Sequence, residues 1–381
     1  MKNRIKNFIK KVVGFAFSLL PLSKVIIFES TPDFSDNTKA VYDEMVRRGL
    51  NRKYKFVWLC FNDSPRSISE KNVKCVNCNT ESGQMKRRYL LYRAKCIICC
   101  NHFIRKNDER IPAFYLTHGT PSKSTRNYYT IPNYIDYCTV PSEGVAEIYS
   151  YQLNFPIEKI YPLGFPRNDA LYNNVDIKTP LGTNCDKVIV WYPTFRQTKR
   201  AIYVVSASAA LPVIHDAEAA KRLNEVAAKN NTLIVLKPHF AQDLSYIKDL
   251  GLSNIRFIDD SFFADNGISS YEFVGSCDAL ITDYSSIYYD FTLCDKPIAA
   301  IWEDIDEYKE NPGLIDNYEF YMKGAEKVYT ADELERFVSD VANGIDNLKA
   351  ERNEIKALVN YSDDGKNAER VVDFIIEKAG L

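Results

Sequence analysis

Four short segments of the sequence combine side chains that could move a proton or bind a phosphate group. The first is the loop from His118 to Ser124, in which one of only four histidines stands beside hydroxyl groups and Lys123. An imidazole in such a loop suits a general base, because its pKa lies near neutral pH. A histidine that merely caps a helix or bonds a loop carbonyl explains this segment equally well.

The second and third segments carry cations next to predicted strand ends. Thr194 and Arg196 offer a hydroxyl and a guanidinium group, which together suit recognition of a phosphate. Lys237 and His239 stand two residues apart, so both face one anionic group if the backbone is extended there. Each segment is weak evidence alone, since most surface arginines and lysines are simply solvated.

The fourth segment, Asp278 to Ser286, is the most informative. Asp283 is a natural N-cap for a helix, with Tyr284, Ser285 and Ser286 in its first turn. Unpaired backbone N–H groups, the positive end of the helix dipole and two hydroxyls would then form a phosphate pocket. The simpler interpretation, a capped helix with serines facing water, is compatible with that pocket.

These segments follow runs of β-branched and aromatic residues that alternate with helical stretches, a pattern typical of parallel sheets covered by helices. In such α/β sheets functional groups gather at the carboxyl ends of the strands. The predicted strands are residues 24–30, 56–60, 96–100, 114–117 and 134–140 in a first series, and 187–192, 232–236, 255–258, 279–282 and 297–301 in a second.

A turn-rich stretch from Asn173 to Asp186 separates the two series and marks a domain boundary. The sequence thus predicts an N-terminal α/β domain over residues 23–173 and a second one over 174–360. Residues 1–22 form a basic helix, and residues 361–381 contain a C-terminal helix that could pack back on the N-terminal domain.

The N-terminal helix is amphipathic, because apolar residues recur at helical spacing beside a stripe of lysines. We interpret it as lying on a membrane surface; a helix docked on its own domain is the alternative. The longest apolar run, Val12 to Leu22, is too short to span a bilayer, and no cleavage pattern of a signal peptide follows. The predicted membrane contacts are Lys2, Arg4, Lys6, Phe8, Ile9, Lys10 and Lys11.

The composition indicates a globular protein, with 381 residues, 46% hydrophobic and 26% charged. Its net charge of -1 hides a split: the first 130 residues carry 25 Lys and Arg against 10 Asp and Glu, and the rest carries 24 against 40. A basic half is attracted to an acidic leaflet by about 1 kcal/mol per basic side chain. A membrane surface fits this better than nucleic acid, and chance segregation of surface charge is the remaining explanation.

The ten cysteines include two pairs, Cys75 with Cys78 and Cys96 with Cys99, at the spacing of a four-thiolate zinc site. However, the second pair falls in a predicted buried strand, where positions three apart point to opposite faces. We therefore expect core thiols and no metal. Unpaired buried cysteines indicate a reducing cytoplasm.

In this order and spacing, the segments resemble the CDP-glycerol glycerophosphotransferases of teichoic acid and related capsule synthesis, including the primase, polymerase and ribitol-phosphate branches. Each motif is modest alone, but the ordered set is specific and covers nearly the whole chain. The matching segments are Phe28–Ser30, His118–Pro121, Gly164–Asp169, Tyr192–Arg196, Lys237–His239 and Leu280–Ser286, with Asp304–Tyr308 in looser form.

The resemblance implies a GT-B fold of two Rossmann-like α/β domains facing across a cleft, and CDP-glycerol or CDP-ribitol as donor without an obligatory cofactor. It makes His118 and His239 the catalytic histidines, with His118 as the base that activates the acceptor. The implied donor-binding residues are Thr194, Arg196, Lys237, Thr282, Asp283, Ser285 and Ser286, and the acceptor-side or supporting residues are Gly119, Thr120, Lys123, Arg167, Asp169 and Asp304.

Two positions depart from the family pattern. The proline that commonly follows the second histidine is replaced by Phe240, with Pro238 before the histidine instead. Where an arginine often precedes a glycine near the acidic loop, this chain has Pro312 and Gly313, so one cation of the donor pocket is in doubt.

The expected reaction takes place at the cytoplasmic face of the membrane: a hydroxyl of a lipid-linked glycan attacks the polyol-side phosphorus, and CMP leaves. A CDP-ribitol donor, a nucleotide-sugar transferase or a nucleotide-sugar epimerase are the alternatives. An inactive membrane scaffold and a zinc-binding module fit less well. No nucleic-acid partner is expected, and the sequence leaves the oligomeric state open.

Overall fold

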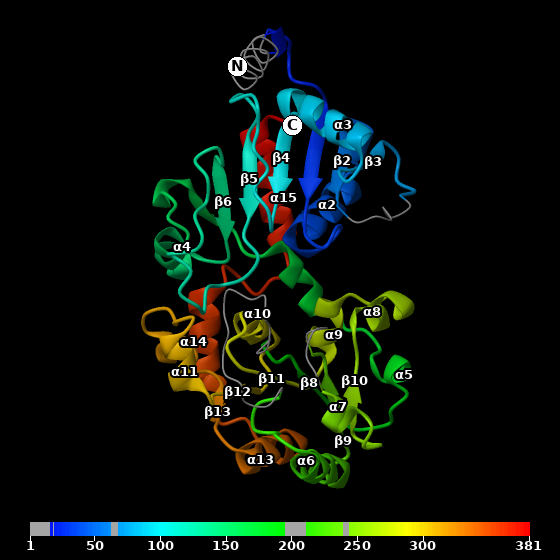
Figure 1. The fold of residues 1–381 in the computed structure, drawn as a ribbon, viewed down its shortest axis with the longest axis vertical. Coiled ribbons are helices and arrows are strands. Elements are labelled where there is room, and N and C mark those ends of the chain that lie inside the picture. Colours follow the sequence, from blue (N-terminus) through cyan, green and yellow to red (C-terminus); the bar gives the residue numbers. More distant parts are fainter. Residues whose placement is uncertain (1–15, 18, 62–67, 195–210, 239–243) are drawn as a thin grey trace. The chain divides into compact units, whose positions relative to one another are not determined.

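Figure 1 shows the fold in a computed structural model that describes residues 16–17, 19–61, 68–194, 211–238 and 244–381. The chain divides into two compact units, each built from several segments. Unit 1 comprises residues 1–118, 128–169 and 366–381, and unit 2 comprises residues 119–127 and 170–365. The predicted membrane-contacting residues of the N-terminal helix, Lys2, Arg4, Lys6, Phe8, Ile9, Lys10 and Lys11, lie outside the described residues.

Unit 1 contains a seven-stranded parallel sheet in the order β3-β2-β1-β4-β5-β6-β7 (Figure 1). Every residue of its central strands β4 and β5 is buried, as expected for a parallel sheet with both faces covered. The strands are β1 (Val25–Glu29), β2 (Lys55–Cys60), β3 (Val73–Asn77), β4 (Cys96–Cys99), β5 (Ala113–Leu116), β6 (Tyr137–Val140) and β7 (Ile160–Pro162).

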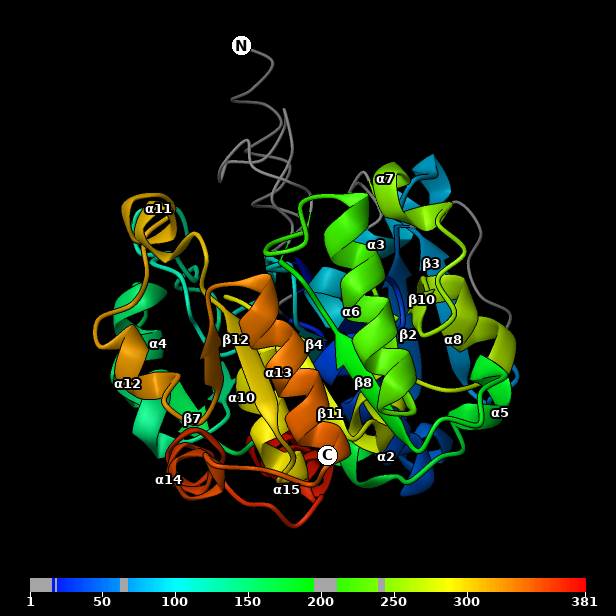
Figure 2. The ribbon, with the colours of Figure 1, turned by 90° about the horizontal axis from the view of Figure 1, so that it is seen from below.

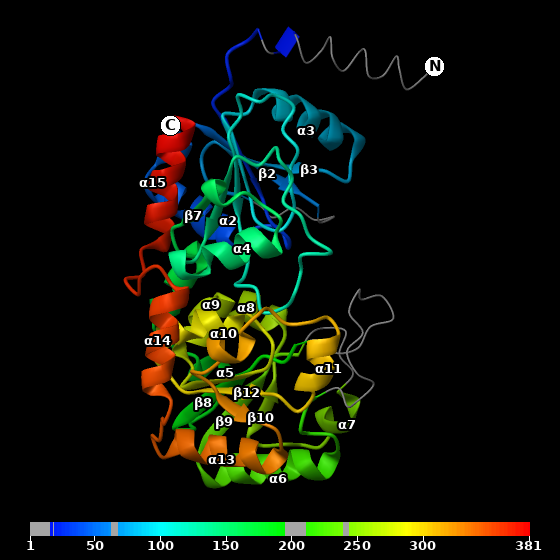
Figure 3. The same ribbon diagram turned by 90° about the vertical axis from the view of Figure 1, so that its left-hand side faces the viewer.

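Two helices from opposite ends of the chain close the core of unit 1. Helices α2 and α15 lie side by side (Figures 1 and 3), and Val41, Met45, Val371 and Ile375 pack with the strand side chains. The helices are α2 (Asp36–Arg47), α3 (Glu81–Arg93), α4 (Ala146–Gln152) and α15 (Asn367–Ala379), with 3-10 turns η1 (Leu50–Arg52), η2 (Glu143–Val145) and η3 (Ile157–Lys159), and η4 (Pro166–Tyr172) leading into unit 2.

Unit 2 contains a six-stranded parallel sheet in the order β10-β9-β8-β11-β12-β13. Its inner strands β9, β11 and β12 are buried along their whole length. The strands are β8 (Lys187–Trp191), β9 (Thr232–Leu236), β10 (Ile255–Phe257), β11 (Ala279–Thr282), β12 (Ile298–Ile301) and β13 (Glu326–Val328).

Helices α6 and α13 pack side by side on the sheet of unit 2 (Figure 2). Asp216 caps α6 by accepting the Ala219 N–H, and Thr330 with Glu333 forms a capping box at α13. The helices are α5 (Lys178–Leu181), α6 (Ala217–Lys229), α7 (Ser245–Lys248), α8 (Asp260–Asn266), α9 (Ser270–Ser276), α10 (Ile287–Phe291), α11 (Ile305–Glu310), α12 (Tyr318–Tyr321), α13 (Ala331–Ala342) and α14 (Lys349–Val359), with the 3-10 turn η5 (Thr292–Cys294).

Both sheets have the strand order of doubly wound α/β folds. In unit 1 the chain runs outward from β1 to β3 and then returns to the other side of β1 as β4. In unit 2 the same return brings β11 beside β8. The order therefore reverses between β1 and β4, and between β8 and β11; such a reversal opens a ligand-binding crevice beyond the carboxyl ends of the strands.

The strand predictions are largely confirmed, since ten of the predicted runs coincide with strands of the structure. The sequence pattern misses β3, β7 and β13. Two of these strands are only three residues long, and β3 carries an exposed lysine within the sequence VKCVN. Such short or polar runs lack the apolar signal that identifies a buried strand.

The final helix of unit 1 is held by Asp169, the last residue of the second segment of that unit. The Asp169 carboxylate accepts the backbone N–H groups of Asn367 (2.9 Å) and Ala368 (2.7 Å), at the start of α15. These N–H groups have no partner within the helix, so the carboxylate satisfies them. Gly164 approaches the same point: its φ is +88°, and a Cβ there would lie 1.8 Å from Asn367 Oδ1.

Replacing Gly164 by alanine is therefore expected to destabilise unit 1 by more than about 3 kcal/mol, because positive φ and a steric clash add together. Gly251→Ala is the matched control: its φ is +64°, but nothing lies within 4 Å of the added Cβ. Strain alone should cost that variant about 1–2 kcal/mol. Thermal unfolding measures the stability of both variants. Equal decreases in Tm would contradict the predicted clash between the Cβ at position 164 and Asn367.

Candidate functional site

In unit 1, His118 lies two residues after the end of β5, at the carboxyl edge of the sheet. Arg167 Nη1 donates to the His118 carbonyl oxygen and to Asp36 Oδ1, both at 2.7 Å. Asn37 Nδ2 donates to the Thr117 carbonyl at 2.5 Å and receives the Arg167 N–H on its Oδ1 at 3.0 Å. The backbone on either side of the imidazole is thereby fastened to the start of α2.

The His118 ring is exposed on one side and held by protein groups on the other. Its Nδ1 lies 3.4 Å from the hydroxyl of Tyr115, whose oxygen is 3.0 Å from that of Tyr129. Burial of part of the ring lowers the pKa of His118, while the Asp36 carboxylate and a hydrogen bond with the Cys100 backbone partly oppose this. A neutral imidazole can accept a proton, as a general base must.

In unit 2, the strand ends at the order reversal are joined by a buried carboxylate. Asp283, directly after β11, accepts the Thr194 N–H at 2.9 and 3.1 Å and also the Thr194 hydroxyl. The Thr282 hydroxyl donates to the Tyr192 carbonyl at 3.0 Å. Thr282 and Asp283 are both almost fully buried, so they fix the loops rather than present themselves to a ligand.

This arrangement corrects the expectation that Asp283 caps a helix. Helix α10 begins at Ile287, and Ser286 occupies the N-cap position without a capping bond from its side chain. Asp283 is committed to Thr194 and to the Tyr284 N–H (2.7 Å) instead. The partly exposed Ser285 and Ser286 remain at this edge of the sheet as candidate phosphate ligands.

Asp304 holds the loop that contains Tyr284, Ser285 and Ser286 through a hydrogen bond to Tyr284. Its Oδ1 accepts the Tyr284 hydroxyl at 2.8 Å, and the Tyr284 ring stacks on Tyr308 with centroids 3.7 Å apart. Asp304 and Tyr284 are both buried. Asp304 is therefore a positioning residue for the loop that carries the two serines.

The loop after His118 belongs to unit 2, which corrects the expectation that Gly119, Thr120 and Lys123 lie in the N-terminal domain. The Ser124 N–H donates to the Gly313 carbonyl (3.0 Å), and Lys123 bridges antiparallel to Leu314. These backbone bonds attach the loop to unit 2.

Inside unit 2, this loop meets the serine-bearing turn. A Cβ on Gly119 would lie 2.6 Å from Ser286 Oγ, so glycine permits a close approach there. Thr120 is buried, and the Lys123 ammonium lies 5.4 Å from the Tyr308 ring centroid.

Of the predicted cations, Lys237 follows β9 and pairs with Asp260 Oδ1 at 2.9 Å. The Asp260 side chain is 90% exposed, so this ion pair is open to exchange with an anionic ligand. Arg196 and His239 lie outside the described residues, and their predicted roles stay predictions. Arg167 and Asp169 act on backbone groups, as described above, and are positioning residues.

Sequence reasoning gave no role to Glu29 or His102, although both lie at the order reversal of unit 1. Glu29 ends β1 and is fully buried, and its Oε1 lies 3.1 Å from Nδ1 of His102, just after β4. The one signal in the sequence was that Glu29 lies in the matched segment Phe28–Ser30. Its pairing with His102 could not be predicted, because the two residues are 73 positions apart.

The cysteine pair on β4, at the spacing of a zinc site but expected to be core thiols, lies in the core of unit 1. Cys96 and Cys99 are both buried on β4, and burial raises the pKa of Cys96 to about 12 and that of Cys99 further. Such thiols stay protonated at neutral pH, whereas zinc binds thiolates. Among the described residues, no three His, Cys, Asp or Glu side chains gather as a metal site would require.

Comparison with known proteins agrees with this architecture. A family model described as CDP-glycerol:poly(glycerophosphate) glycerophosphotransferase matches residues 14–377. The teichoic acid glycerol-phosphate primase of Bacillus subtilis is 23% identical over 82% of each chain. The teichoic acid poly(ribitol-phosphate) polymerase of Bacillus spizizenii is 25% identical over 94% of this chain and 57% of its own length.

Among solved structures, a variant of the wall teichoic acid polymerase TagF superimposes with a TM-score of 0.74 at 22% identity, covering 99% of this chain and 96% of the other. That likeness shows the shared fold of two Rossmann-like α/β domains, as predicted. Because the family model spans nearly the entire sequence, the chain belongs to the CDP-glycerol:poly(glycerophosphate) glycerophosphotransferase family.

Proposed function

We propose that this enzyme transfers glycerol phosphate from CDP-glycerol to a hydroxyl of a lipid-linked glycan and releases CMP. Family membership supports the reaction class. The observation that carries the residue assignment is the Asp283 carboxylate bonded to Thr194, which holds Ser285 and Ser286 at the ligand-binding edge of unit 2.

The donor diphosphate is assigned to unit 2. Ser285 and Ser286 supply hydroxyl donors, and Lys237 supplies a positive charge once it leaves the exposed Asp260 carboxylate. Charge-assisted hydrogen bonds of this kind stabilise the phosphate oxygens as the leaving CMP gains negative charge. Arg196 and His239 complete the proposed set.

His118 is assigned as the general base. The acceptor oxygen forms a new bond to the glycerol-side phosphorus, its proton passes to the imidazole, and the bond from that phosphorus to the CMP oxygen breaks. A pKa lowered by partial burial keeps the imidazole neutral at pH 7, ready to accept the proton. General-base catalysis of this kind contributes about 10²- to 10⁴-fold.

A donor screen tests the proposed reaction. CMP release should be fastest with CDP-glycerol when a lipid-linked disaccharide is the acceptor. CDP-ribitol is the second candidate, because a poly(ribitol-phosphate) polymerase is among the similar proteins. Faster turnover with CDP-ribitol would reassign the donor, and turnover only with a nucleotide sugar would overturn the proposal.

Two variants separate binding from chemistry. His118→Ala should bind CDP-glycerol normally but lose at least about 100-fold in kcat, because it removes only the proton acceptor. The double variant Ser285→Ala/Ser286→Ala should instead weaken donor binding about tenfold or more. Ser253→Ala, at an exposed serine before the amino end of β10 and so at the opposite edge of the sheet from the proposed site, is the control. Full turnover by His118→Ala, or unchanged donor affinity of the double variant, would refute the corresponding role.

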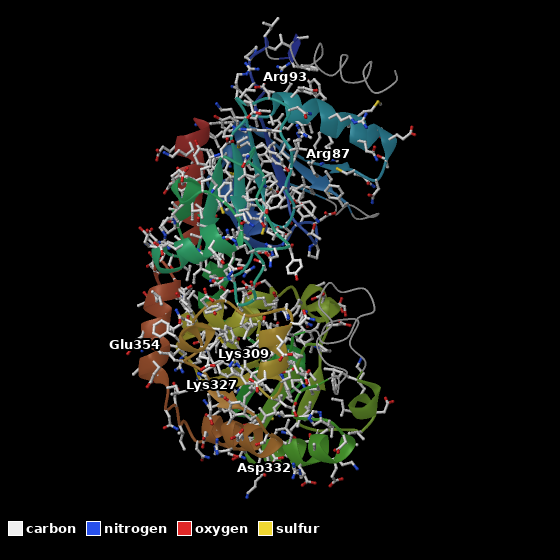
Figure 4. All side chains as sticks on the ribbon, turned by 60° about the vertical axis from the view of Figure 1, so that its left-hand side comes forward. Arg87, Arg93, Lys309, Lys327, Asp332 and Glu354 are labelled. Carbon is white, nitrogen blue, oxygen red and sulfur yellow. The ribbon has the colours of Figure 1, made fainter. Side chains whose placement is uncertain are left out.

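A membrane location is proposed from the N-terminal part of unit 1. In the described part of the chain, no helix is long and apolar enough to cross a bilayer. Leu19 and Leu20 are exposed, and so are Met85 and Tyr89 on α3. The same helix carries the arginines labelled in Figure 4, Arg87 and Arg93. Apolar and basic side chains together suit the cytoplasmic surface of an acidic membrane.

Deleting residues 1–20 is expected to abolish cosedimentation with vesicles containing anionic lipid, while CMP release with a water-soluble acceptor persists. The expected helix supplies several lysines, each worth about 1 kcal/mol at such a surface. Neutral phosphatidylcholine vesicles are the control for nonspecific adhesion. Undiminished binding to anionic vesicles would eliminate the proposed anchor.

A further inference from the structure

A buried carboxylate and an exposed imidazole form a dyad at the order reversal of unit 1. Glu29 ends β1 with none of its surface exposed, whereas the His102 side chain is 65% exposed. Glu29 Oε1 lies 3.1 Å from His102 Nδ1. The dyad thus places a reactive ring on the surface and its partner beneath it, where α/β sheets bind ligands.

The hydrogen bonds of Glu29 are concentrated on His102. The carboxylate bonds both the ring and the backbone of His102, and the Thr31 hydroxyl adds a longer contact of 3.5 Å. Its other oxygen, Oε2, is buried and has no hydrogen-bond partner within the part of the chain that the structure describes. Burial raises the pKa of Glu29, and His102 opposes that shift. Burying a carboxyl group costs free energy unless hydrogen bonds compensate for the lost water. The hydrogen bonds of Glu29 go mainly to His102, so we infer that Glu29 serves to orient the His102 ring.

Two oxygen atoms lie close to one nitrogen of the imidazole. His102 Nδ1 has both Glu29 Oε1 and, at 2.9 Å, Thr31 Oγ1 as neighbours. When Nδ1 carries the proton it donates to these oxygens, and Nε2 then presents a lone pair. Among the described residues, no hydrogen-bond partner is recorded for Nε2. The oriented ring therefore offers one free polar atom to solvent.

The loop that carries His102 is attached to the loop after β1 and lies near His118. The Asn101 side chain accepts the Thr31 N–H at 3.0 Å, which fastens the loop after β1 to the loop after β4. His102 is also close enough to His118 to influence its pKa, and both follow adjacent parallel strands. The two imidazoles thus share the carboxyl edge of one sheet.

We propose that His102 is an acceptor-binding residue whose Nε2 hydrogen-bonds to a hydroxyl of the acceptor other than the one that attacks phosphorus. Glu29 is its positioning residue, since it touches the ring and not the ligand. The proposal rests on the proposed function, in which the acceptor approaches unit 1 and His118 activates it. It assigns recognition of the acceptor to His102 and proton removal to His118.

The test is steady-state kinetics of CMP release with a lipid-linked disaccharide as the varied substrate and saturating CDP-glycerol. His102→Ala should raise the acceptor KM about tenfold, with kcat and CDP-glycerol affinity nearly unchanged. His102→Gln, whose amide can reach the position of Nε2, should recover part of that loss. Glu29→Gln should raise KM about threefold, and the double variant Glu29→Gln/His102→Ala no more than His102→Ala alone.

Asp43→Asn is the control for Glu29→Gln, because it removes a half-exposed carboxylate on α2 that pairs with Lys39. An unchanged acceptor KM in His102→Ala, a loss confined to kcat, or fully multiplicative effects in the double variant would each overturn the inference. Absence of CMP release by the wild-type enzyme would instead refute the proposed function itself.

Discussion

The Asp283 carboxylate, buried directly after β11 and bonded to both the N–H and the hydroxyl of Thr194, is the constraint on which the strand-end loops of unit 2 depend. It joins the two strand ends where the sheet order reverses. Tyr284, next to Asp283, is in turn fixed by Asp304. The turn that carries the two serines is therefore held in place by buried residues.

Unit 1 also has a buried carboxylate at the point where its strand order reverses, but the group bonded to it is an imidazole. Glu29 is the buried carboxylate there, and His102 is the group that it fastens across the reversal between β1 and β4. In unit 2 the fastened group is a threonine that rigidifies a loop; in unit 1 it is an imidazole that remains exposed. Both carboxylates are almost fully buried, and each is hydrogen-bonded to a side chain from a neighbouring strand end.

Local sequence was sufficient for most of the fold. Runs such as TLIVL at β9 and CIIC at β4 identify buried parallel strands, and the ordered motifs identify the family. Contacts between distant residues were not accessible in this way. The sequence predicts that Asp283 caps a helix, because its actual partner, Thr194, is 89 positions away. The sequence also assigns the loop after His118 to the first domain, because no local pattern predicts the backbone bond between Ser124 and Gly313.

The composition of unit 1 from three chain segments also bears on how the protein is made. Val371 and Ile375, which complete the core beside α2, lie close to the C-terminus. During synthesis from the N-terminus, α2 therefore leaves the ribosome long before the residues of α15 that pack beside it. In that interval the apolar side of α2 lacks these partners, and the newly made part of unit 1 is exposed to chaperones and proteases.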